Sequence, residues 1–330
     1  MRYGCERQPV GATGLTVSRL GVGGGSLANV HGDAGVGALL DGSWAAGLRY
    51  FDTASFYAAG ESERRFGVEL RGRPRDDYVL STKLGRFVRD GREVFDYTAA
   101  GAEATLAGSL RRLGLGRVDI VFIHDLTPAL HGSDFESQYR IAMEGAYPYL
   151  AELRAQGVIR AVGIAMADAE VSLRFARDGQ FDCFMLAGGY TLLEHASLGT
   201  LLRNCAASGG SVMVAAPFNT GILAIGAVEG ARFFYKPATP NILARTAAIE
   251  AVCRHHAVPL TAAALQFPLA HPAVVSVVAG HQSVAEVQAN LDLLDQAIPE
   301  AFWHELKAAG LLPADAPTPV HGVERVLMQD

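Results

Sequence analysis

The sequence predicts a single α/β domain over residues 1–330, with the fold of a (β/α)8 barrel. Short apolar runs rich in Val, Ile, Phe, Tyr and Leu alternate along the chain with segments of helical periodicity. There are eight such runs, and a helical pattern follows each one. No change in composition divides the 330 residues, which favours one barrel over two domains or an open doubly wound sheet.

The elements are expected in strict alternation. Strands are predicted at 18–23, 49–53, 78–85, 118–124, 159–165, 181–187, 211–216 and 273–279. Helices are predicted at 34–47, 61–71, 98–113, 139–156, 168–178, 194–208, 242–256 and 284–294. Glycines such as Gly47 and Gly114 stand between a helix and the next strand, where they suit helix-ending turns.

Four further segments complete the expected chain path. PVGATGLTVSRL predicts a short hairpin around residues 12–14 that closes the bottom of the barrel. The connections 125–138 and 217–239 follow strands and are longer than a turn requires, which is typical of functional loops at the catalytic face. The tail after Leu311 carries three prolines and is expected to run irregularly over the surface.

Bulk properties exclude several classes of protein. The net charge is −6 and no run of Lys or Arg occurs, so nucleic acid is not an expected partner. The N-terminus lacks an apolar signal region and no apolar stretch is long enough for a membrane span, which predicts a cytoplasmic protein. The four cysteines are widely separated and are expected to be reduced thiols.

Four polar residues stand at or near the ends of successive predicted strands. Asp52 and Tyr57 accompany the second run, Lys83 the third and His124 the fourth. Because the carboxyl ends of parallel barrel strands share one mouth, these side chains should converge there. Each alone has an ordinary structural explanation, such as a helix cap for Asp52, but their joint occurrence favours a catalytic site.

These residue types can make a tuned general acid and base. Tyrosine transfers protons poorly near neutral pH because its reference pKa is about 10, and a nearby ammonium group lowers that pKa. Lys83 would therefore lower the pKa of Tyr57, and Asp52 would keep Lys83 charged and oriented. His124 would share the phenol proton and position a substrate oxygen. No metal is required, since no Cys cluster is present and Lys and Tyr dominate the set.

The same segments resemble the aldo-keto reductase family. FDTASFYAAGESERRFG is similar to its Asp and Tyr signature, STK to its lysine segment and LRRLGLGRVDIVFIHD to its histidine segment. LRAQGVIRAVGIA and HPAVVSVVAGHQSVAEVQANLDLL resemble its fifth-strand and cofactor-binding regions, so the similarity covers nearly the whole chain. The resemblance implies a TIM barrel with a nicotinamide cofactor extended across its mouth, without a Rossmann fold. It also implies that Tyr57 is the proton donor and acceptor.

The chain departs from the family pattern at the expected nicotinamide site. Ala165 and Met166 stand where many members have a Ser-Asn pair that holds the amide, and Asp168 is the nearby candidate for that contact. Many members have a tyrosine before a Ser-Pro-Leu motif, and this tyrosine stacks on the nicotinamide. This chain reads Ala215, Ala216, Pro217 and Phe218 in that region, which makes Phe218 the candidate stacking ring. The Gln common after strand six has no clear counterpart in FMLAGGYTLLEH.

Other cofactor contacts are implied at the two ends of the chain. Gly24 should lie in a tight first loop near the cofactor, and Gly280 and Asn290 belong to the cofactor-binding end. Where NADP-preferring members carry an Arg that grips the 2′-phosphate, the resemblance places Glu286. A carboxylate repels a phosphate and suits a free ribose diol, so NAD is the expected cofactor, with NADP possible.

Within the family, GESERRFGVELRGRPRDDYVLSTKLGR and AAPFNTGILA resemble members that oxidise sugars or pyridoxal. The leading expectation is NAD-dependent oxidation of an aldose hemiacetal, of the L-fucose, L-galactose or D-arabinose type, to its lactone. Asp125 would contact sugar hydroxyls or, equally, cap a loop. Pyridoxal oxidation to 4-pyridoxolactone is the alternative, with Phe56, Phe87 or Phe218 as ring contacts.

Two other hypotheses remain open at this point. The first is an NADPH-dependent aldehyde reductase, and the second is a non-catalytic, cofactor-sensing subunit. The intact set of four polar residues disfavours the second. The sequence is compatible with a monomer or a small homo-oligomer, because no repeat or heptad pattern decides the assembly.

Overall fold

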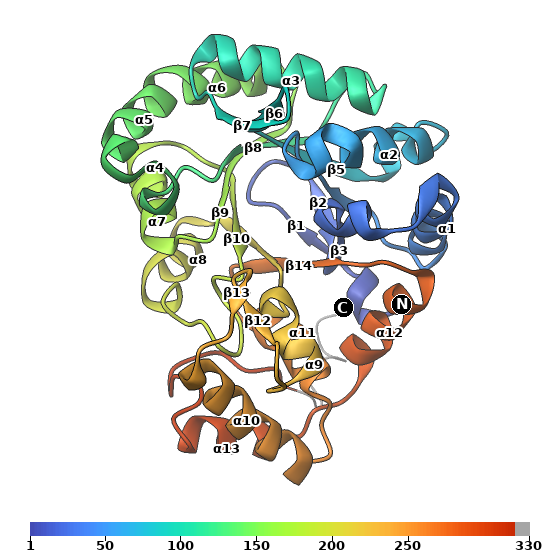
Figure 1. Cartoon of the computed structure of the whole chain (residues 1–330), viewed down its shortest axis with the longest axis vertical. Helices are drawn as coiled ribbons and strands as arrows, with labels where there is room; N and C mark the ends of the chain where they lie inside the picture. The colour runs from blue at the N-terminus through green and yellow to red at the C-terminus, as the bar shows by residue number, and fades with distance from the viewer. Residues whose placement is uncertain (321–330) are drawn as a thin grey trace.

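The computed structural model describes residues 1–320, and its centre is a closed barrel of eight parallel strands (Figure 1). The barrel strands are β3 (Leu20–Gly23), β4 (Tyr50–Asp52), β5 (Val79–Leu84), β8 (Ile120–His124), β9 (Ala161–Met166), β10 (Cys183–Ala187), β11 (Ser211–Ala215) and β14 (Val274–Gly280). They follow one another around the ring in chain order. The predicted (β/α)8 barrel and its eight strands are confirmed; residues 321–330 of the predicted domain and tail lie outside the described residues.

Helices cover the outside of the ring. They are α1 (Gly32–Ala45), α2 (Glu61–Leu70), α3 (Ala99–Leu113), α5 (Phe135–Ile141), α6 (Tyr147–Ala155), α7 (Ala169–Asp178), α8 (Arg203–Ser208), α11 (Leu260–Leu269) and α12 (Val284–Asp295). A π-helical segment at 142–146 joins α5 to α6, and another at 198–202 leads into α8. Local sequence sets the boundaries: the Thr98 hydroxyl accepts the Gly101 N–H at the start of α3, and left-handed Gly114 ends that helix.

One helix that packs against the barrel was missed by the sequence analysis. The predicted helix at 242–256 exists as α10 (Pro240–His255), but it packs against α13 (Glu300–Ala308) and lies beyond the barrel at the foot of Figure 1. The helix that connects β11 to β14 against the barrel is α11, which was not predicted. Its sequence LTAAALQFPL offers almost no polar face, and residues 262–269 are all buried. A helix buried all round carries no amphipathic signal.

The predicted N-terminal hairpin is present and closes the bottom of the barrel. Strands β1 (Arg7–Pro9) and β2 (Thr16–Ser18) pair antiparallel. Val10, Leu15 and Val17 from this hairpin are buried in the same apolar cluster as barrel-interior residues such as Tyr50 and Phe122. The barrel is therefore filled from below, and its free space lies at the carboxyl ends of the strands.

Two further hairpins rise from the opposite face. Strands β6 (Arg86–Arg89) and β7 (Arg92–Phe95) follow β5 directly, and β12 (Arg232–Phe233) and β13 (Lys236–Pro237) lie in the long connection after β11. The other long connection contains the one-turn helix α4 (Pro128–His131), and α9 (Ile222–Ile225) precedes β12. These segments form the rim of the barrel mouth.

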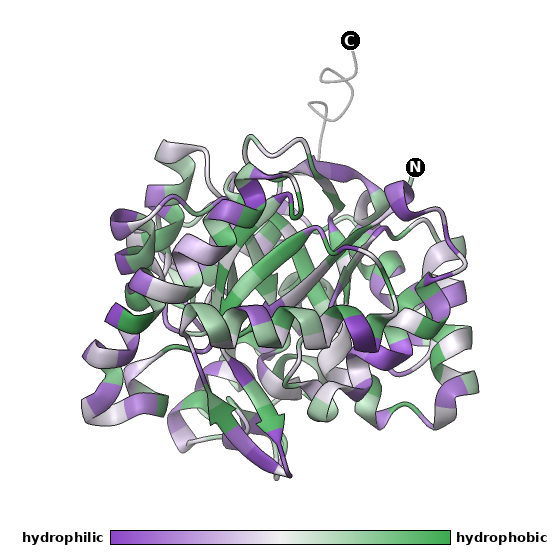
Figure 2. Ribbon diagram, turned by 90° about the horizontal axis from the view of Figure 1, so that it is seen from above, coloured by the Kyte–Doolittle hydropathy of each residue, from purple (hydrophilic) through white to green (hydrophobic). Residues whose placement is uncertain are grey.

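Hydropathy follows this layering. In Figure 2 the central strands are mostly hydrophobic, whereas the surrounding helices mix hydrophobic and hydrophilic residues. All four cysteines are free and buried. The tail after Leu311 has no regular structure up to residue 320, but it buries Leu312 and Ala316 against the core. None of the helices in residues 1–320 combines the length and apolar character needed to cross a membrane.

Candidate active site

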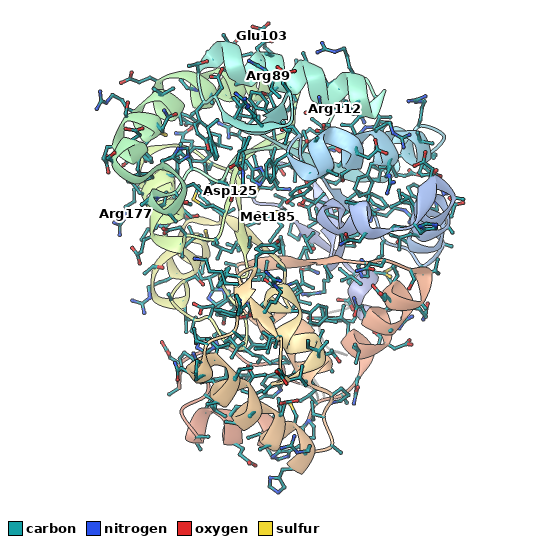
Figure 3. The ribbon with its side chains drawn as sticks, viewed as in Figure 1. Arg89, Glu103, Arg112, Asp125, Arg177 and Met185 are labelled. Atoms are coloured by element: carbon teal, nitrogen blue, oxygen red, sulfur yellow. The ribbon has the colours of Figure 1, made fainter. Side chains whose placement is uncertain are left out.

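A cavity of about 600 Å³ opens at the carboxyl ends of the barrel strands. Its lining includes Tyr57, Lys83 and His124, so three of the four predicted catalytic residues reach it directly. Asp52 lies behind Lys83 and is buried. Figure 3 shows Asp125 and Met185, two further lining residues, near the middle of the ring of strands.

Lys83 and Asp52 form a buried ion pair on neighbouring strands. Nζ of Lys83 lies 2.6 Å from Oδ2 of Asp52 and donates a second hydrogen bond of 2.8 Å to the Thr53 carbonyl. The Ser81 hydroxyl donates to the other oxygen of Asp52 at 2.6 Å. Burial lowers the pKa of Lys83, but Asp52 and Tyr57 outweigh it and raise the pKa overall. Lys83 is therefore a fixed cation, as the sequence predicted.

Tyr57 stands beside this cation, with its ring centre 4.7 Å from Nζ of Lys83. Three residues in the left-handed region follow it: Ala58, Ala59 and Gly60. Left-handed alanine is strained, and such strain is typical of functional sites. This sharp reversal of the backbone places the phenol at the mouth of the barrel before α2 begins.

The expected net lowering of the Tyr57 pKa is wrong. Burial raises the pKa of Tyr57 to about 12, and the charge of Asp52 adds to that effect. Lys83 acts in the predicted direction but does not compensate for the loss of water around the phenolate. Tyr57 is thus a protonated phenol at neutral pH and can donate its proton to a substrate oxygen. Positive charge added nearby would favour loss of that proton and leave a phenolate that can accept one.

His124 completes the set at the end of β8. Its ring meets the Tyr57 ring edge to face, with the ring centres 5.9 Å apart. Burial lowers the pKa of His124 to about 4, so the imidazole is neutral at physiological pH. The Tyr97 hydroxyl donates a 2.9 Å hydrogen bond to the His124 carbonyl and fixes the end of the strand. A neutral imidazole can orient a substrate oxygen beside the phenol without competing for its proton.

Asp125 is a wall residue of the cavity with a strained backbone. Its φ is 51°, and its carboxylate lines the cavity. Oδ2 accepts a 2.5 Å hydrogen bond from Nη1 of Arg86 and lies 3.3 Å from Nε2 of His124. The side chain therefore faces the site and pairs with Arg86, which favours the substrate-contact interpretation over the loop cap.

Arg86 was missed by the sequence analysis, although a signal for its position existed. Asp90 and Gly91 both have positive φ, which is the two-residue turn that joins β6 to β7. An Asp-Gly pair between short alternating runs is a strong hairpin signal. The hairpin starts immediately after β5 and so places Arg86 at the mouth, next to Asp125.

Aromatic residues form part of the rim, with one difference from expectation. Phe56 lines the cavity as predicted, and the Arg86 guanidinium covers its ring at 3.9 Å. Phe87 does not line the cavity. It follows Arg86 on β6, and successive side chains of a strand point to opposite faces, so Phe87 points away from the face that Arg86 occupies. Its ring lies near the Arg89 guanidinium. Phe234 and Tyr235, at the tip of the β12–β13 hairpin, line the cavity and were not predicted.

The cofactor residues named from the resemblance are spread more widely. Ala165 lines the cavity. Phe218 does not; it is half-buried at the start of a 3₁₀ turn and packs against the core. The Asp168 carboxylate is engaged as the cap of α7, where it accepts the N–H groups of Glu170 and Val171. Asp168 is therefore a helix cap, and the structure does not bring it to the cavity.

The remaining cofactor candidates lie around the first loop and the start of α12. Gly24 is buried so tightly that a Cβ there would lie 2.4 Å from the Ser62 hydroxyl, which gives this glycine a packing role. Gly280 ends β14 at the mouth and is exposed, and Asn290 is buried on α12. None of these three residues lines the cavity that contains Tyr57.

Glu286 lies in the first turn of α12 and completes a capping box. Its carboxylate accepts the Gln282 N–H at 2.8 Å, and its own N–H donates to the Ser283 hydroxyl at 3.2 Å. The helix N-terminus therefore already has a carboxylate in the place where an anion would otherwise bind.

A planar nicotinamide ring fits the wall across the barrel from Tyr57. Ala165, Ala187, Gly188 and Ala215, at the ends of β9, β10 and β11, line this wall. Their small side chains leave a flat apolar surface with room for a ring. Within residues 1–320, the group of side chains that lies close enough to hold a metal ion is His255, His256 and Glu305, on α10 and α13 outside this cavity.

Comparison with known proteins gives a consistent result. The model of the Aldo/keto reductase family matches residues 19–310. A D-threo-aldose 1-dehydrogenase from Pseudomonas sp is 36% identical over 92% of this chain and 97% of its own. A pyridoxal 4-dehydrogenase from Microbacterium luteolum is 34% identical over 93% of this chain and 98% of its own. A holo-form aldo-keto reductase from Bacillus halodurans superposes with a TM-score of 0.79 at 24% identity, covering 97% and 99% of the two chains.

Proposed function

This chain belongs to the aldo/keto reductase family, and we propose that it is an NAD-dependent dehydrogenase that oxidises the hemiacetal of an aldose to its lactone. The substrate class is that of L-fucose, L-galactose and D-arabinose. The observation that carries the proposal is the convergence of Tyr57, Lys83, Asp52 and His124 at the base of one cavity.

The reaction needs one proton acceptor beside C1 of the sugar. Oxidised NAD would be held against the wall of Ala165, Ala187, Gly188 and Ala215, where it would supply a hydride acceptor and a positive charge beside the phenol. Tyr57 first loses its phenol proton to water, which the positive charges of Lys83 and of the cofactor would favour, and the phenolate then receives the proton of the anomeric hydroxyl as the C1 carbonyl forms. His124 holds the C1 oxygen, and Asp52 keeps Lys83 in place. The products are the lactone, reduced NAD and one proton.

A polyhydroxylated substrate suits the polar side of the cavity. Asp125 and Arg86 place a carboxylate and a guanidinium in its wall, and Thr127 and Thr220 add hydroxyl groups. The similarity to a D-threo-aldose 1-dehydrogenase supports the same class. A substrate rich in hydroxyls needs such partners once it is shielded from water.

The preference for NAD rests on Glu286. This carboxylate occupies the N-terminus of α12, beside the exposed end of β14. A ribose 2′-phosphate bound at this end would meet a negative charge instead of free helix N–H groups. A ribose diol carries no such penalty and can donate hydrogen bonds to the carboxylate.

Pyridoxal is the second candidate, because specific residues favour it. Phe56, Phe234 and Tyr235 give the rim aromatic surfaces that suit a pyridine ring. The similarity to a pyridoxal 4-dehydrogenase points in the same direction. The chemistry at Tyr57 would be the same, since pyridoxal also forms a cyclic hemiacetal that is oxidised to a lactone.

The setting of the reaction is part of the proposal. The cytoplasm is supported by four buried cysteines that remain free. The intact and buried catalytic set supports an enzyme over a cofactor-sensing subunit. The protein acts as a monomer or a small homo-oligomer.

The test is the initial rate of NADH formation at mildly alkaline pH. L-fucose, L-galactose, D-arabinose, D-glucose and pyridoxal are each assayed with NAD and with NADP. NAD-linked oxidation of the first three supports the proposal, and oxidation of pyridoxal alone moves the assignment to the second candidate. Silence across the panel, with NADPH-dependent reduction of simple aldehydes, contradicts both the substrate class and the role of Glu286.

A further inference from the structure

The strongest unexplained feature of the cavity is its one charged pair outside the catalytic set. Among the lining residues within 1–320, the charged side chains are Lys83, Arg86 and Asp125. Lys83 is committed to Asp52 and Tyr57. The side chains of this ion pair are only 18% and 21% exposed, and the rest of the wall is mostly apolar. Such a pair needs a reason, because the cost of desolvation is offset only by good geometry and further partners.

We propose that Asp125 and Arg86 recognise two adjacent hydroxyl groups of the aldose, those on C2 and C3. This inference rests on the proposed function and names the part of the sugar that the site reads. The position of the pair, its unused hydrogen-bonding atoms and its rigidity support this assignment.

Its position follows from His124. Oδ2 of Asp125 lies 3.3 Å from Nε2 of His124, the ring that faces Tyr57. If the C1 oxygen of the sugar lies between Tyr57 and His124, a carboxylate beside the same imidazole faces either the ring oxygen or C2, and of these only the C2 hydroxyl can donate a hydrogen bond to it. The reactive carbon therefore fixes which hydroxyl groups Asp125 can reach.

Both partners line the cavity and keep hydrogen-bonding atoms that no contact within the described residues uses. The contacts of Asp125 with Arg86 and His124 use Oδ2, and Oδ1 has no hydrogen-bond partner among the described residues. Arg86 uses Nη1 for Asp125, and Nε and Nη2 for Glu93, which leaves further N–H groups on its planar fork. An acceptor beside a donor matches two neighbouring hydroxyl groups, each of which can donate and accept.

The pair is also held rigidly. The Arg86 guanidinium lies 3.9 Å from the centre of the Phe56 ring, and Glu93 fixes its other side with a 2.6 Å hydrogen bond. Asp125 is held by its left-handed backbone and by its N–H, which donates to the Ala165 carbonyl at 3.0 Å. Groups fixed before binding discriminate better than groups that must be ordered by the substrate.

The test compares L-fucose with 2-deoxy-L-fucose and 3-deoxy-L-fucose in the wild type and in Asp125→Asn. Asparagine tolerates the left-handed conformation, so the backbone at this position is preserved. The variant should lower kcat/KM for L-fucose by about 10- to 100-fold, mainly through KM, because a hydrogen bond to a charged group is lost. 2-Deoxy-L-fucose lacks the hydroxyl group beside Asp125 and should lose less than about threefold, whereas 3-deoxy-L-fucose keeps that hydroxyl group and should lose as much as L-fucose.

Two further variants sharpen the result. Arg86→Lys keeps the positive charge but not the planar fork that lies on Phe56, and it should also reduce the preference for L-fucose over the deoxy sugars. Glu136→Gln is the matched control, because it changes a carboxylate to an amide in the surface pair with Arg174, away from the cavity. It should leave all rates unchanged.

The outcomes separate this inference from the proposed function. If Asp125→Asn lowers the rates for L-fucose and the deoxy sugars equally, the pair is only structural and the inference is overturned while the dehydrogenase remains. If the wild type does not distinguish L-fucose from the deoxy sugars, the inference also fails. If the wild type oxidises pyridoxal and no aldose, the proposed substrate class fails first, and the inference fails with it.

Discussion

Nζ of Lys83 lies 2.6 Å from Oδ2 of Asp52, and the side chains of both residues are almost wholly buried. Removing one partner leaves an uncompensated charge in the interior. Asp52→Asn should therefore destabilise the fold by about 3–5 kcal/mol, measured by urea denaturation. The double variant Asp52→Leu with Lys83→Met removes both charges and should recover most of that loss. Equal stability of Asp52→Asn and the wild type would contradict the buried-pair interpretation.

Tyr57→Phe removes the phenol and keeps the ring. Dehydrogenase turnover should fall by about 100- to 10,000-fold, because a positioned proton acceptor contributes that much. Cofactor binding, measured by fluorescence titration, should be retained. Tyr149→Phe on α6, where Tyr149 is half-buried and outside the cavity, is the matched control and should keep full activity. Substantial turnover in Tyr57→Phe would exclude this residue as the proton acceptor.

Stability should fall as the pH decreases from 6.5 to 4, and His281 should cause part of the loss. Burial lowers the pKa of His281 from its ordinary value of 6.5 to about 4. In this window the unfolded chain binds a proton that the folded protein does not, so unfolding is favoured by up to about 3 kcal/mol. His281→Leu should remove that share at pH 4 and change little at pH 8. Urea midpoints across the range test this, and parallel curves for the two proteins would refute it.

Glu286→Arg should shift the cofactor preference towards NADP. Replacing a repulsive carboxylate by a guanidinium should raise kcat/KM for NADP by about 10- to 100-fold relative to NAD. The variant also breaks the capping box of α12, which should cost about 1 kcal/mol of stability. Ser283→Ala removes the other half of the box without a change of charge and serves as the control. If Ser283→Ala shifts the preference equally, charge is not the cause.

The β12–β13 turn should be more stable with ordinary turn residues. Phe234 and Tyr235 both have positive φ, at 46° and 64°. This backbone suits Asn-Gly, and bulky residues there are strained. Phe234→Asn with Tyr235→Gly should raise the free energy of unfolding by about 1–2 kcal/mol and raise KM, because two aromatic wall groups are lost. Thermal denaturation and initial rates measure the two effects, and an unchanged KM would show that neither ring contacts ligand.

The strands and the convergence of the four polar residues could be predicted because their signals are local. Eight apolar runs with Asp52, Tyr57, Lys83 and His124 at fixed places are visible in one dimension, and parallel strands place their ends together. The helix α11 was missed because it is apolar all round, which removes the period that identifies a surface helix.

The wall of the cavity was harder to predict than its base. Arg86 and Asp125 meet across two different loops, and no periodicity in the sequence reports such a contact. The Tyr57 pKa depends on how much water the fold excludes, which is a property of packing and not of neighbouring residue types. Both features therefore become visible only in the three-dimensional structure.

The hairpin of β1 and β2 plugs the floor of the barrel with Val10, Leu15 and Val17. A barrel that is closed at one end is open only at its mouth, so the cofactor and the sugar must both bind and dissociate through the mouth. The molecule that lies deeper has to enter first and leave last. Ordered turnover would then be a consequence of the floor of the barrel, at the face farthest from the chemistry.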